Sequence, residues 1–158
     1  MFQQKNKKAV SPVIATVLLI AMVIVIGLIV FLWFRGTIAE EKTKFGKNIK
    51  LVCNDVEFEA DYDNGRLDIS NSGNVPIFSM KVKIFSDGSH TTKNLGDISN
   101  EWSETGLNSG RTFSGDIKSS IGDANKIILI PVLVGNSESG EKTYTCDADQ
   151  HGYVINLS

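Results

Sequence analysis

An uncharged apolar run over residues 13–34 (VIATVLLIAMVIVIGLIVFLWF) constrains this chain more than any other feature. Of its 22 residues, 16 are Leu, Ile, Val or Phe, and all 18 acidic residues of the chain lie after position 39. At ~1.5 Å per helical residue the run reaches ~33 Å, which is enough for the ~30 Å hydrocarbon core of a bilayer. Because lipid leaves every backbone group to be satisfied within the segment, the run predicts a membrane-spanning helix.

The apolar run has an expected start and an expected extension. Ser11 as the N-cap and Pro12 in the first turn predict where the helix begins. The following residues 37–45 (TIAEEKTKF) are compatible with a helix, and Gly46 is a reasonable stop. We therefore expect a hydrophobic N-terminal helix over residues 9–46. The alternative is a flexible linker after the apolar run.

The charges around the apolar run leave its orientation open, because basic residues flank both ends. A removable secretory signal fits poorly, since the apolar core is too long and residues 35–37 offer no small-x-small cleavage site. The N-terminal tail is short, and both cysteines lie in the C-terminal part, which is compatible with an oxidising exterior. We expect a single-pass precursor with a cytoplasmic N-terminus and a C-terminal part outside the cell.

The remainder of the chain has the length of one small domain. Residues 36–158 carry 12 basic and 18 acidic groups, a formal net charge of −6. A strongly basic nucleic-acid binder is therefore excluded, and no nucleic-acid partner is expected. Alternating Val, Ile, Leu and Phe residues argue against intrinsic disorder in this part of the chain.

Alternating apolar and polar residues after position 49 predict short strands. The stretches 56–60 and 67–69 flank Asp-Asn-Gly at 63–65, which predicts a hairpin. The stretch 78–84 alternates between apolar and polar residues, and Ser-Asp-Gly at 86–88 closes it. Each of these stretches is expected to bury one face.

Further strands are expected towards the C-terminus. The stretch 126–134 (KIILIPVLV) is nearly continuous in apolar residues, and Pro131 within it suggests an edge strand or a bulge. Residues 142–146 and 153–157 complete the set, whereas the Gly- and Ser-rich stretch 96–124 is expected to include a long loop.

Together these strands predict an immunoglobulin-like antiparallel β-sandwich over residues 49–158, so that the fold class is α+β. Cys53 and Cys146 are candidates for a disulfide from the first strand to a late one. Closing a loop of about 90 residues would stabilise the fold by ~4 kcal/mol in the chain-entropy model. On a regular strand Cys53 would lie on the opposite face from Val56, and two unpaired thiols or an intermolecular bridge are the alternatives.

Catalytic and metal-binding patterns are not evident in the sequence. His90 and His151 have no ligand spacing to a cysteine or to each other, and the acidic stretches 61–65 and 147–151 do not follow a calcium loop. Trp102 is expected to pack in the core, with an exposed contact to a sugar or neighbouring subunit as its alternative. The sequence contains no nucleophile elbow, phosphate loop or zinc pattern, so we expect neither an enzyme nor a cofactor.

Residues 5–20 (KNKKAVSPVIATVLLI) resemble the N-terminus of an archaeal type IV pilin precursor. A basic tail ends at Lys8, the small residue Ala9 follows, and Ser-Pro-Val-Ile opens the apolar run. The resemblance implies cleavage between Lys8 and Ala9 by a prepilin peptidase, with the apolar helix retained. Bacterial members usually carry Glu at the fifth mature position, which is Val13 here, so the resemblance is to the archaeal branch.

The resemblance implies a structural subunit of an extracellular filament that serves surface adhesion. Residues 1–8 would be the leader peptide, and the helix would sit in membrane lipid first and in a helical homopolymer later. Its implied partners are other copies of itself, the peptidase, a pilus assembly ATPase and a membrane platform. The alternative is a permanently anchored single-pass surface protein with an immunoglobulin-like binding domain. The expected filament-core residues are Val13, Ile14, Val17, Leu18, Ile20, Val23, Ile26, Leu28 and Phe31.

Overall fold

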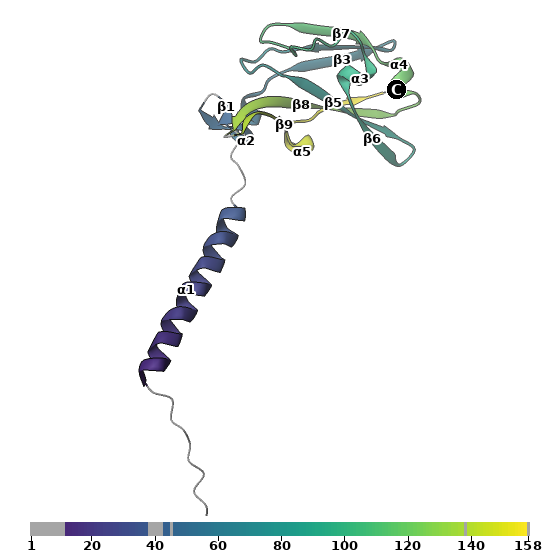
Figure 1. Cartoon of the computed structure of the whole chain (residues 1–158). Helices are drawn as coiled ribbons and strands as arrows, with labels where there is room; N and C mark the ends of the chain where they lie inside the picture. Colours follow the sequence, from purple (N-terminus) through teal and green to yellow (C-terminus); the bar gives the residue numbers. More distant parts are fainter. Residues whose placement is uncertain (1–11, 38–42, 45, 138, 158) are drawn as a thin grey trace, which may run out of the picture. The chain divides into compact units, whose positions relative to one another are not determined.

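The structure is a computed structural model, and its two compact units are Met1–Glu40 and Glu41–Ser158. It describes residues 12–37, 43–44, 46–137 and 139–157. The first unit contains an apolar helix, and the second is built mostly of antiparallel strands (Figure 1). The α+β class expected from the sequence is therefore confirmed.

The helix of the first unit is α1 (Pro12–Thr37), which has 26 residues. It confirms that the apolar run is helical, with Pro12 as its first described residue. The expected extension to position 46 is wrong at Thr43 and Lys44, which form the strand β1 (Thr43–Lys44). An i,i+4 pair between Glu40 and Lys44 would have contributed only a few tenths of a kcal/mol, less than sheet pairing supplies. Residues 9–11, 38–42 and 45 lie outside the described residues.

Through a turn at Gly46, β1 pairs with β2 (Lys47–Asn48), with Thr43 opposite Asn48 and Lys44 opposite Lys47. Gly46 has a φ of +72° and lies in this turn, where a glycine adopts the left-handed region without strain. The sequence predicted it as a helix stop, and the structure makes it a hairpin residue. Thr43 also pairs with Asn136, which attaches the hairpin to the larger sheet. The domain therefore begins before residue 49, its expected start.

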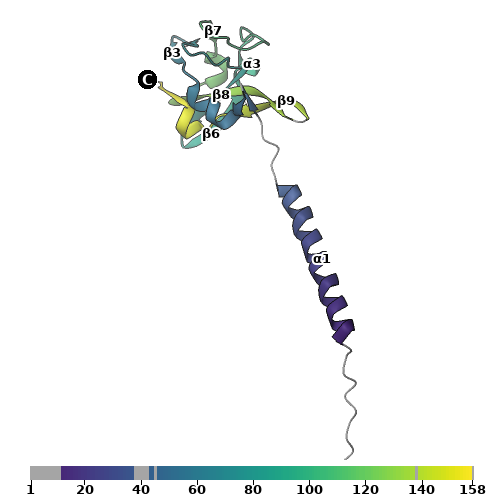
Figure 2. The same cartoon turned by 90° about the vertical axis from the view of Figure 1, so that its left-hand side faces the viewer.

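The second unit has two antiparallel sheets, which lie one above the other in both views (Figures 1 and 2). The larger sheet has the order β2-β1-β8-β5-β6, with β9 and β10 also paired to β8, and the smaller has the order β3-β4-β7. The strands are β3 (Glu59–Asp63), β4 (Arg66–Ser70), β5 (Ser79–Ser86), β6 (Ser89–Asn94), β7 (Thr112–Asp116), β8 (Lys126–Ser137), β9 (Gly140–Thr145) and β10 (Tyr153–Asn156). The short helices are α2 (Ile49–Val52), α3 (Leu95–Ile98), α4 (Lys118–Ile121) and α5 (Ala148–His151), and Cys53–Asp55 forms a 3₁₀ turn.

Alternate residues of the two sheets meet in one core. Because successive side chains on a strand point to opposite faces, one face of each sheet can be apolar and the other polar. The inward set includes Leu67 and Ile69 of β4, Met80, Val82 and Ile84 of β5, Phe113 of β7, and Ile127 and Leu129 of β8. The outer faces of the two sheets therefore point away from each other.

Two hairpin turns of the domain have the backbone that their residues favour. Asn64 and Gly65 join β3 to β4 with φ values of 51° and 95°, and Asp87 and Gly88 join β5 to β6 with 44° and 79°. Two successive residues at positive φ characterise the type I′ turn, whose twist matches that of paired strands. The hairpin predicted at residues 63–65 is confirmed, and the predicted end of the strand at 86–88 is confirmed as a turn that leads into β6.

The prediction that Pro131 marks an edge strand or a bulge is wrong, because β8 lies between other strands and keeps its register through this residue. One side of β8 pairs with β5, and the other pairs with β10 up to Leu129 and with β9 from Val132. The carbonyl of Pro131 accepts a hydrogen bond from the Cys146 N–H at 3.0 Å, on the side of β9. The missing N–H of Pro131 therefore falls where β10 has ended and β9 has yet to begin.

The stretch 96–124 contains more structure than expected. It includes most of α3, all of β7 and α4, and only the connection over residues 99–111 resembles the long loop that the sequence predicts. β7 pairs with β4, with Phe113 opposite Ile69, and completes the smaller sheet. Trp102 in the connection is half-buried, and its ring centroid lies 5.3 Å from that of Phe113, which confirms core packing.

Candidate functional site

Among the residues that the structure describes, α1 holds most of the large apolar side chains that are exposed. Its stretch Pro12–Phe34 is long and apolar enough to cross a membrane, by length and composition. Every residue of that stretch is exposed within the single chain, so burial has to come from outside it. The nine expected filament-core residues are 54–68% exposed: Val13, Ile14, Val17, Leu18, Ile20, Val23, Ile26, Leu28 and Phe31.

The polar groups of α1 suit an apolar environment. Thr16 donates its hydroxyl hydrogen to the carbonyl oxygen of Val13 at 2.9 Å, so that the hydroxyl needs no outside partner. At Gly27 an added Cβ would meet open space, so neighbouring chains can approach the backbone closely there. The predicted cleavage pair Lys8 and Ala9 and the predicted N-cap Ser11 lie outside the described residues.

Cys53 and Cys146 form a disulfide, as expected, with their Cα atoms 5.8 Å apart and a sequence separation of 93. The expected first strand does not exist at Cys53, which instead lies in the 3₁₀ turn after α2. The conflict of faces with Val56 therefore does not arise. The bridge is buried in a second core cluster with Ile49, Val52, Val75 and Leu133. It joins the start of the domain to the end of β9.

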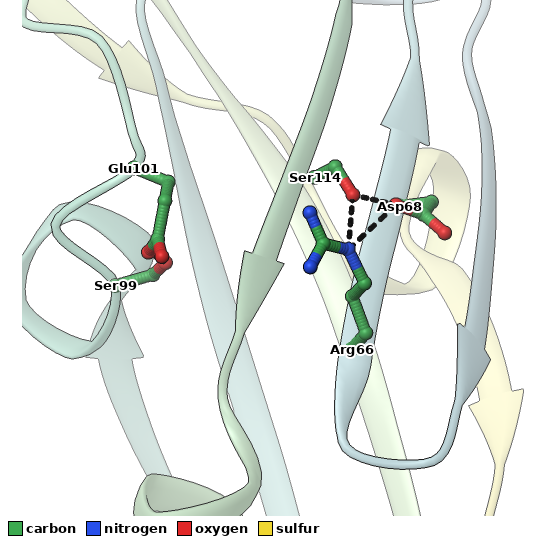
Figure 3. Close-up of polar contacts among 5 residues, drawn as sticks. All are labelled: Arg66, Asp68, Ser99, Glu101 and Ser114. Carbon is green, nitrogen blue, oxygen red and sulfur yellow. Dashed lines mark hydrogen bonds and ion pairs between the residues drawn. The ribbon is translucent and has the colours of Figure 1, made fainter.

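Three polar side chains meet on the outer face of the smaller sheet (Figure 3). Asp68 of β4 lies opposite Ser114 of β7, and the Ser114 hydroxyl donates to the Asp68 carboxylate. The Arg66 Nε donates to the Ser114 oxygen at 2.6 Å and lies 3.9 Å from Asp68 Oδ1. This arrangement gives the Asp68 carboxylate an ion-pair partner and a hydrogen-bond donor on the exposed outer face of the sheet.

Glu101 accepts a hydrogen bond from the buried Ser99 hydroxyl at 2.5 Å (Figure 3). This bond chiefly lowers the pKa of Glu101, aided by a hydrogen bond from its own backbone N–H and by the charge of Arg66, and partly opposed by desolvation. Glu101 is exposed and Ser99 packs below it. A lowered pKa keeps this carboxylate charged, which suits a structural acceptor better than a general base.

The candidate histidines take part in local contacts. The His151 Nε2 lies 2.8 Å from the Asn54 Oδ1, whereas its buried Nδ1 has no hydrogen-bond partner. The Asp147 carboxylate accepts from the N–H groups of Asp149 and Gln150 and thereby caps α5. His90 lies against the Phe85 ring at 5.6 Å. His151, Asp147 and His90 therefore each contact neighbouring residues of the domain.

A shallow hollow of about 850 Å³ lies between the 3₁₀ turn, residues 56–59, α5 and β10. It contains the tilted pair Phe58 and Tyr153, whose ring centroids are 5.7 Å apart. Among the residues that the structure describes, no group of three or more His, Cys, Asp or Glu could hold a metal ion.

Comparison of the chain with protein-family models, curated proteins and solved structures finds no match. The function of this chain therefore has to be inferred from its own residues and contacts. Two features stand out from them: an exposed apolar helix, and a disulfide-bridged β domain with its own core.

Proposed function

We propose that this chain is a structural subunit of an extracellular filament of the archaeal type IV pilus kind, with a role in surface adhesion. The precursor is inserted in the membrane with its N-terminus in the cytoplasm. A prepilin peptidase then removes residues 1–8 by cleaving between Lys8 and Ala9. An assembly ATPase and a membrane platform add the mature subunit to the filament.

One observation carries the proposal: the stretch Pro12–Phe34 of α1 is apolar on every side and exposed throughout. A helix that is apolar all round has to be buried all round. Lipid supplies that burial to the precursor, and identical helices supply it in a filament core. The same surface can therefore serve as an anchor first and as a polymerisation surface later. The basic tail before Ala9 supports a transfer of the helix from lipid to neighbouring helices. Removal of the tail takes away the lysines that hold the helix at the membrane face.

The β domain supports display outside the cell. Its disulfide is of a kind that persists in oxidising surroundings and is rare in the cytosol. Its two packed antiparallel sheets support the immunoglobulin-like architecture that we assign to the head. We place this head on the filament surface, where it meets the material to which the cell adheres.

A second candidate function is a permanently anchored surface protein whose β domain binds a partner without polymerising. The hollow beside Phe58 and Tyr153 favours it, because aromatic side chains next to polar groups suit a binding surface. The two candidates share the membrane-spanning helix. They differ in whether the leader is removed and in whether α1 contacts copies of itself.

N-terminal sequencing and whole-protein mass measurement of material from the native cell surface separate the two candidates. A chain that begins at Ala9 in sheared surface material is the result expected for a filament subunit. A chain that keeps Lys8 and occurs only in the membrane fraction would overturn the filament proposal and favour the permanent anchor. Electron microscopy of the sheared material checks that the processed chain is polymeric.

A further inference from the structure

The part of the larger sheet's outer face that lies over β5, β6, β10 and the first residues of β8 carries positive charge. On β5 the buried residues Met80, Val82 and Ile84 alternate with the outward residues Lys81, Lys83 and Phe85. The register places His90, Thr92 and Asn94 of β6, Lys126 and Ile128 of β8, and Val154 and Asn156 of β10 on the same side. These ten outward positions, which we call the basic face, hold three lysines and no carboxylate, a formal charge of +3. Beyond the basic face, Glu141 of β9 lies on the same side by register, and α5, which includes Asp149, ends next to the Ile128 side chain.

The basic face also has apolar surface. The Lys126 ammonium lies 4.3 Å from the centre of the Phe85 ring, and the Lys83 ammonium lies 5.2 Å from it. Val154 beside them is 50% exposed. Lysines held over an aromatic ring are partly ordered before any partner arrives, which lowers the entropy cost of binding a carboxylate.

The outer face of the smaller sheet has the opposite charge. Its outward residues, which we call the acidic face, alternate with inward residues along all three strands. They include five carboxylates and one guanidinium, a formal charge of −4. In the described part of the chain only Asp68 among these carboxylates has an ion-pair partner, Arg66. The acidic face consists of Glu59, Asp61, Asp63, Arg66, Asp68, Ser70, Thr112, Ser114 and Asp116.

Repulsion between the carboxylates of the acidic face destabilises the isolated domain. Asp61 lies directly opposite Asp68 on the neighbouring strand, and like charges in that position destabilise a sheet. The pKa of Tyr62, on the inner side of β3, is raised by burial and, to a smaller extent, by the negative charge of Asp116. A cationic partner over this face would relieve the repulsion.

The two faces are opposite in formal charge, and each holds a pair of charges at the ordinary spacing of alternate strand residues. Lys81 and Lys83 are two residues apart on β5, and Asp61 and Asp63 are two residues apart on β3. Two residues along an extended strand span ~6.7 Å, so both pairs of charges have the same separation. The faces point away from each other, because the shared core lies between the sheets. One domain therefore cannot join its own two faces, although two copies can.

We propose that the basic face of one copy docks on the acidic face of the next copy. The contact is heterologous, since each copy uses a different face towards each neighbour, and it leaves one face free at either end of a row. Such a contact repeats without closing, as a filament requires. This inference rests on the proposed filament for its setting and adds to it the partner of the β domain: the β domain of another copy.

Charge reversal tests the contact on the full chain in zwitterionic detergent micelles. Sedimentation velocity measures self-association there without any need for leader cleavage or filament assembly. We expect the wild-type chain to associate at ~20 mM salt and to lose at least tenfold in affinity at ~500 mM, where screening is strong. Lys81→Glu with Lys83→Glu should cause a similar loss at low salt, and so should Asp61→Lys with Asp63→Lys.

Rescue makes the test decisive. One rescue variant carries all four substitutions, so that both faces are reversed in the same chain. The other rescue is an equimolar mixture of the basic-face variant and the acidic-face variant. Both should regain association to within about threefold of wild type, because opposite charges again meet. The matched control is Lys47→Glu with Lys50→Glu, which changes the same charge on exposed residues outside both faces and should associate as wild type does. Failure of the rescue, or an equal loss in the control, would overturn the proposed contact.

The outcomes separate this contact from the proposed function. Salt-sensitive association with rescue, in a chain that keeps Lys8 on the cell surface, would support the contact and reject the filament. Filaments from a chain that starts at Ala9, with every reversed variant associating normally, would support the filament and reject the contact. Binding of the basic face to anionic lipid in mixed micelles, without self-association, would assign that face to lipid headgroups and also reject the contact.

Discussion

The helix α1 exposes its apolar residues, whereas the β domain buries most of its own. Of the 22 large apolar residues that are exposed in the described chain, 18 lie on α1, and only Leu51, Phe78, Tyr153 and Val154 lie on the domain. The domain buries its own apolar side chains between two sheets and closes itself with a disulfide. A substitution in α1 should therefore change what the chain associates with, and a substitution in the domain core should change whether the domain folds.

The largest expected effect is on assembly, from Ile26→Asp. The 16 strongly apolar residues favour insertion by roughly 5–10 kcal/mol in total, and a central Asp costs ~3 kcal/mol, so the precursor should still enter the membrane. A carboxylate between packed helices has no partner there, so filaments should disappear from sheared material. Electron microscopy measures this loss, and Ile26→Val is the matched control that should assemble. Normal filaments from Ile26→Asp, with the domain folded, would contradict a helical core.

The disulfide should have the next largest effect, on the free energy of unfolding of the domain. Closing 93 residues stabilises the folded state by ~4 kcal/mol in the chain-entropy model. Reduction of the wild type, or the pair Cys53→Ser and Cys146→Ser, should therefore lower the midpoint of urea denaturation. The Ser variant should not respond further to reductant, which is the control. An unchanged midpoint after reduction would show that the buried cluster around the bridge holds the fold without it.

The same contrast explains what the sequence could predict. In lipid the apolar run can only be a helix, and Asn64-Gly65 and Asp87-Gly88 favour one turn type. These elements were therefore predictable from local chemistry. β6 has no apolar alternation, since all six of its residues are exposed, and it exists only because β5 offers it an edge. β7 pairs with β4, some forty residues away in sequence. Long-range pairing of this kind leaves no periodic pattern to detect.

In the candidate site, too, local features could be predicted and long-range ones could not. Cys53 and Cys146 could be named as candidates from their number, but the 3₁₀ turn that aligns Cys53 depends on packing against Val52 and Leu133. The two charged faces were also missed, because each is assembled from strands that are distant in sequence. Alternation along β3 and β5 separately could have indicated them once the partners were known.

A smaller effect on domain stability is expected from Asn71→Ala. Asn71 is fully buried, and its Nδ2 donates to the carbonyls of Val75 and Leu107 at 2.9 and 3.0 Å. Its loss leaves buried carbonyl groups unpaired, which should cost ~2–3 kcal/mol of unfolding free energy. The exposed Asn74→Ala is the control and should cost less than ~0.5 kcal/mol. Equal urea midpoints for the two variants would contradict a structural role for Asn71.

The smallest expected effect is on the titration of Glu101. The Ser99 hydroxyl is the main cause of its lowered pKa, so Ser99→Ala should raise the pKa of Glu101 towards its usual value, and Arg66→Ala should raise it less. NMR titration of the side-chain carboxyl carbon measures both shifts, and a larger effect of Arg66→Ala would reverse the assigned order of causes. Because the folded pKa lies below the unfolded one, Glu101 stabilises the domain above the unfolded pKa, and this contribution disappears as the pH falls through the folded pKa. Ser99→Ala should therefore reduce the stability lost on acidification, by a small amount because the carboxylate is exposed to solvent.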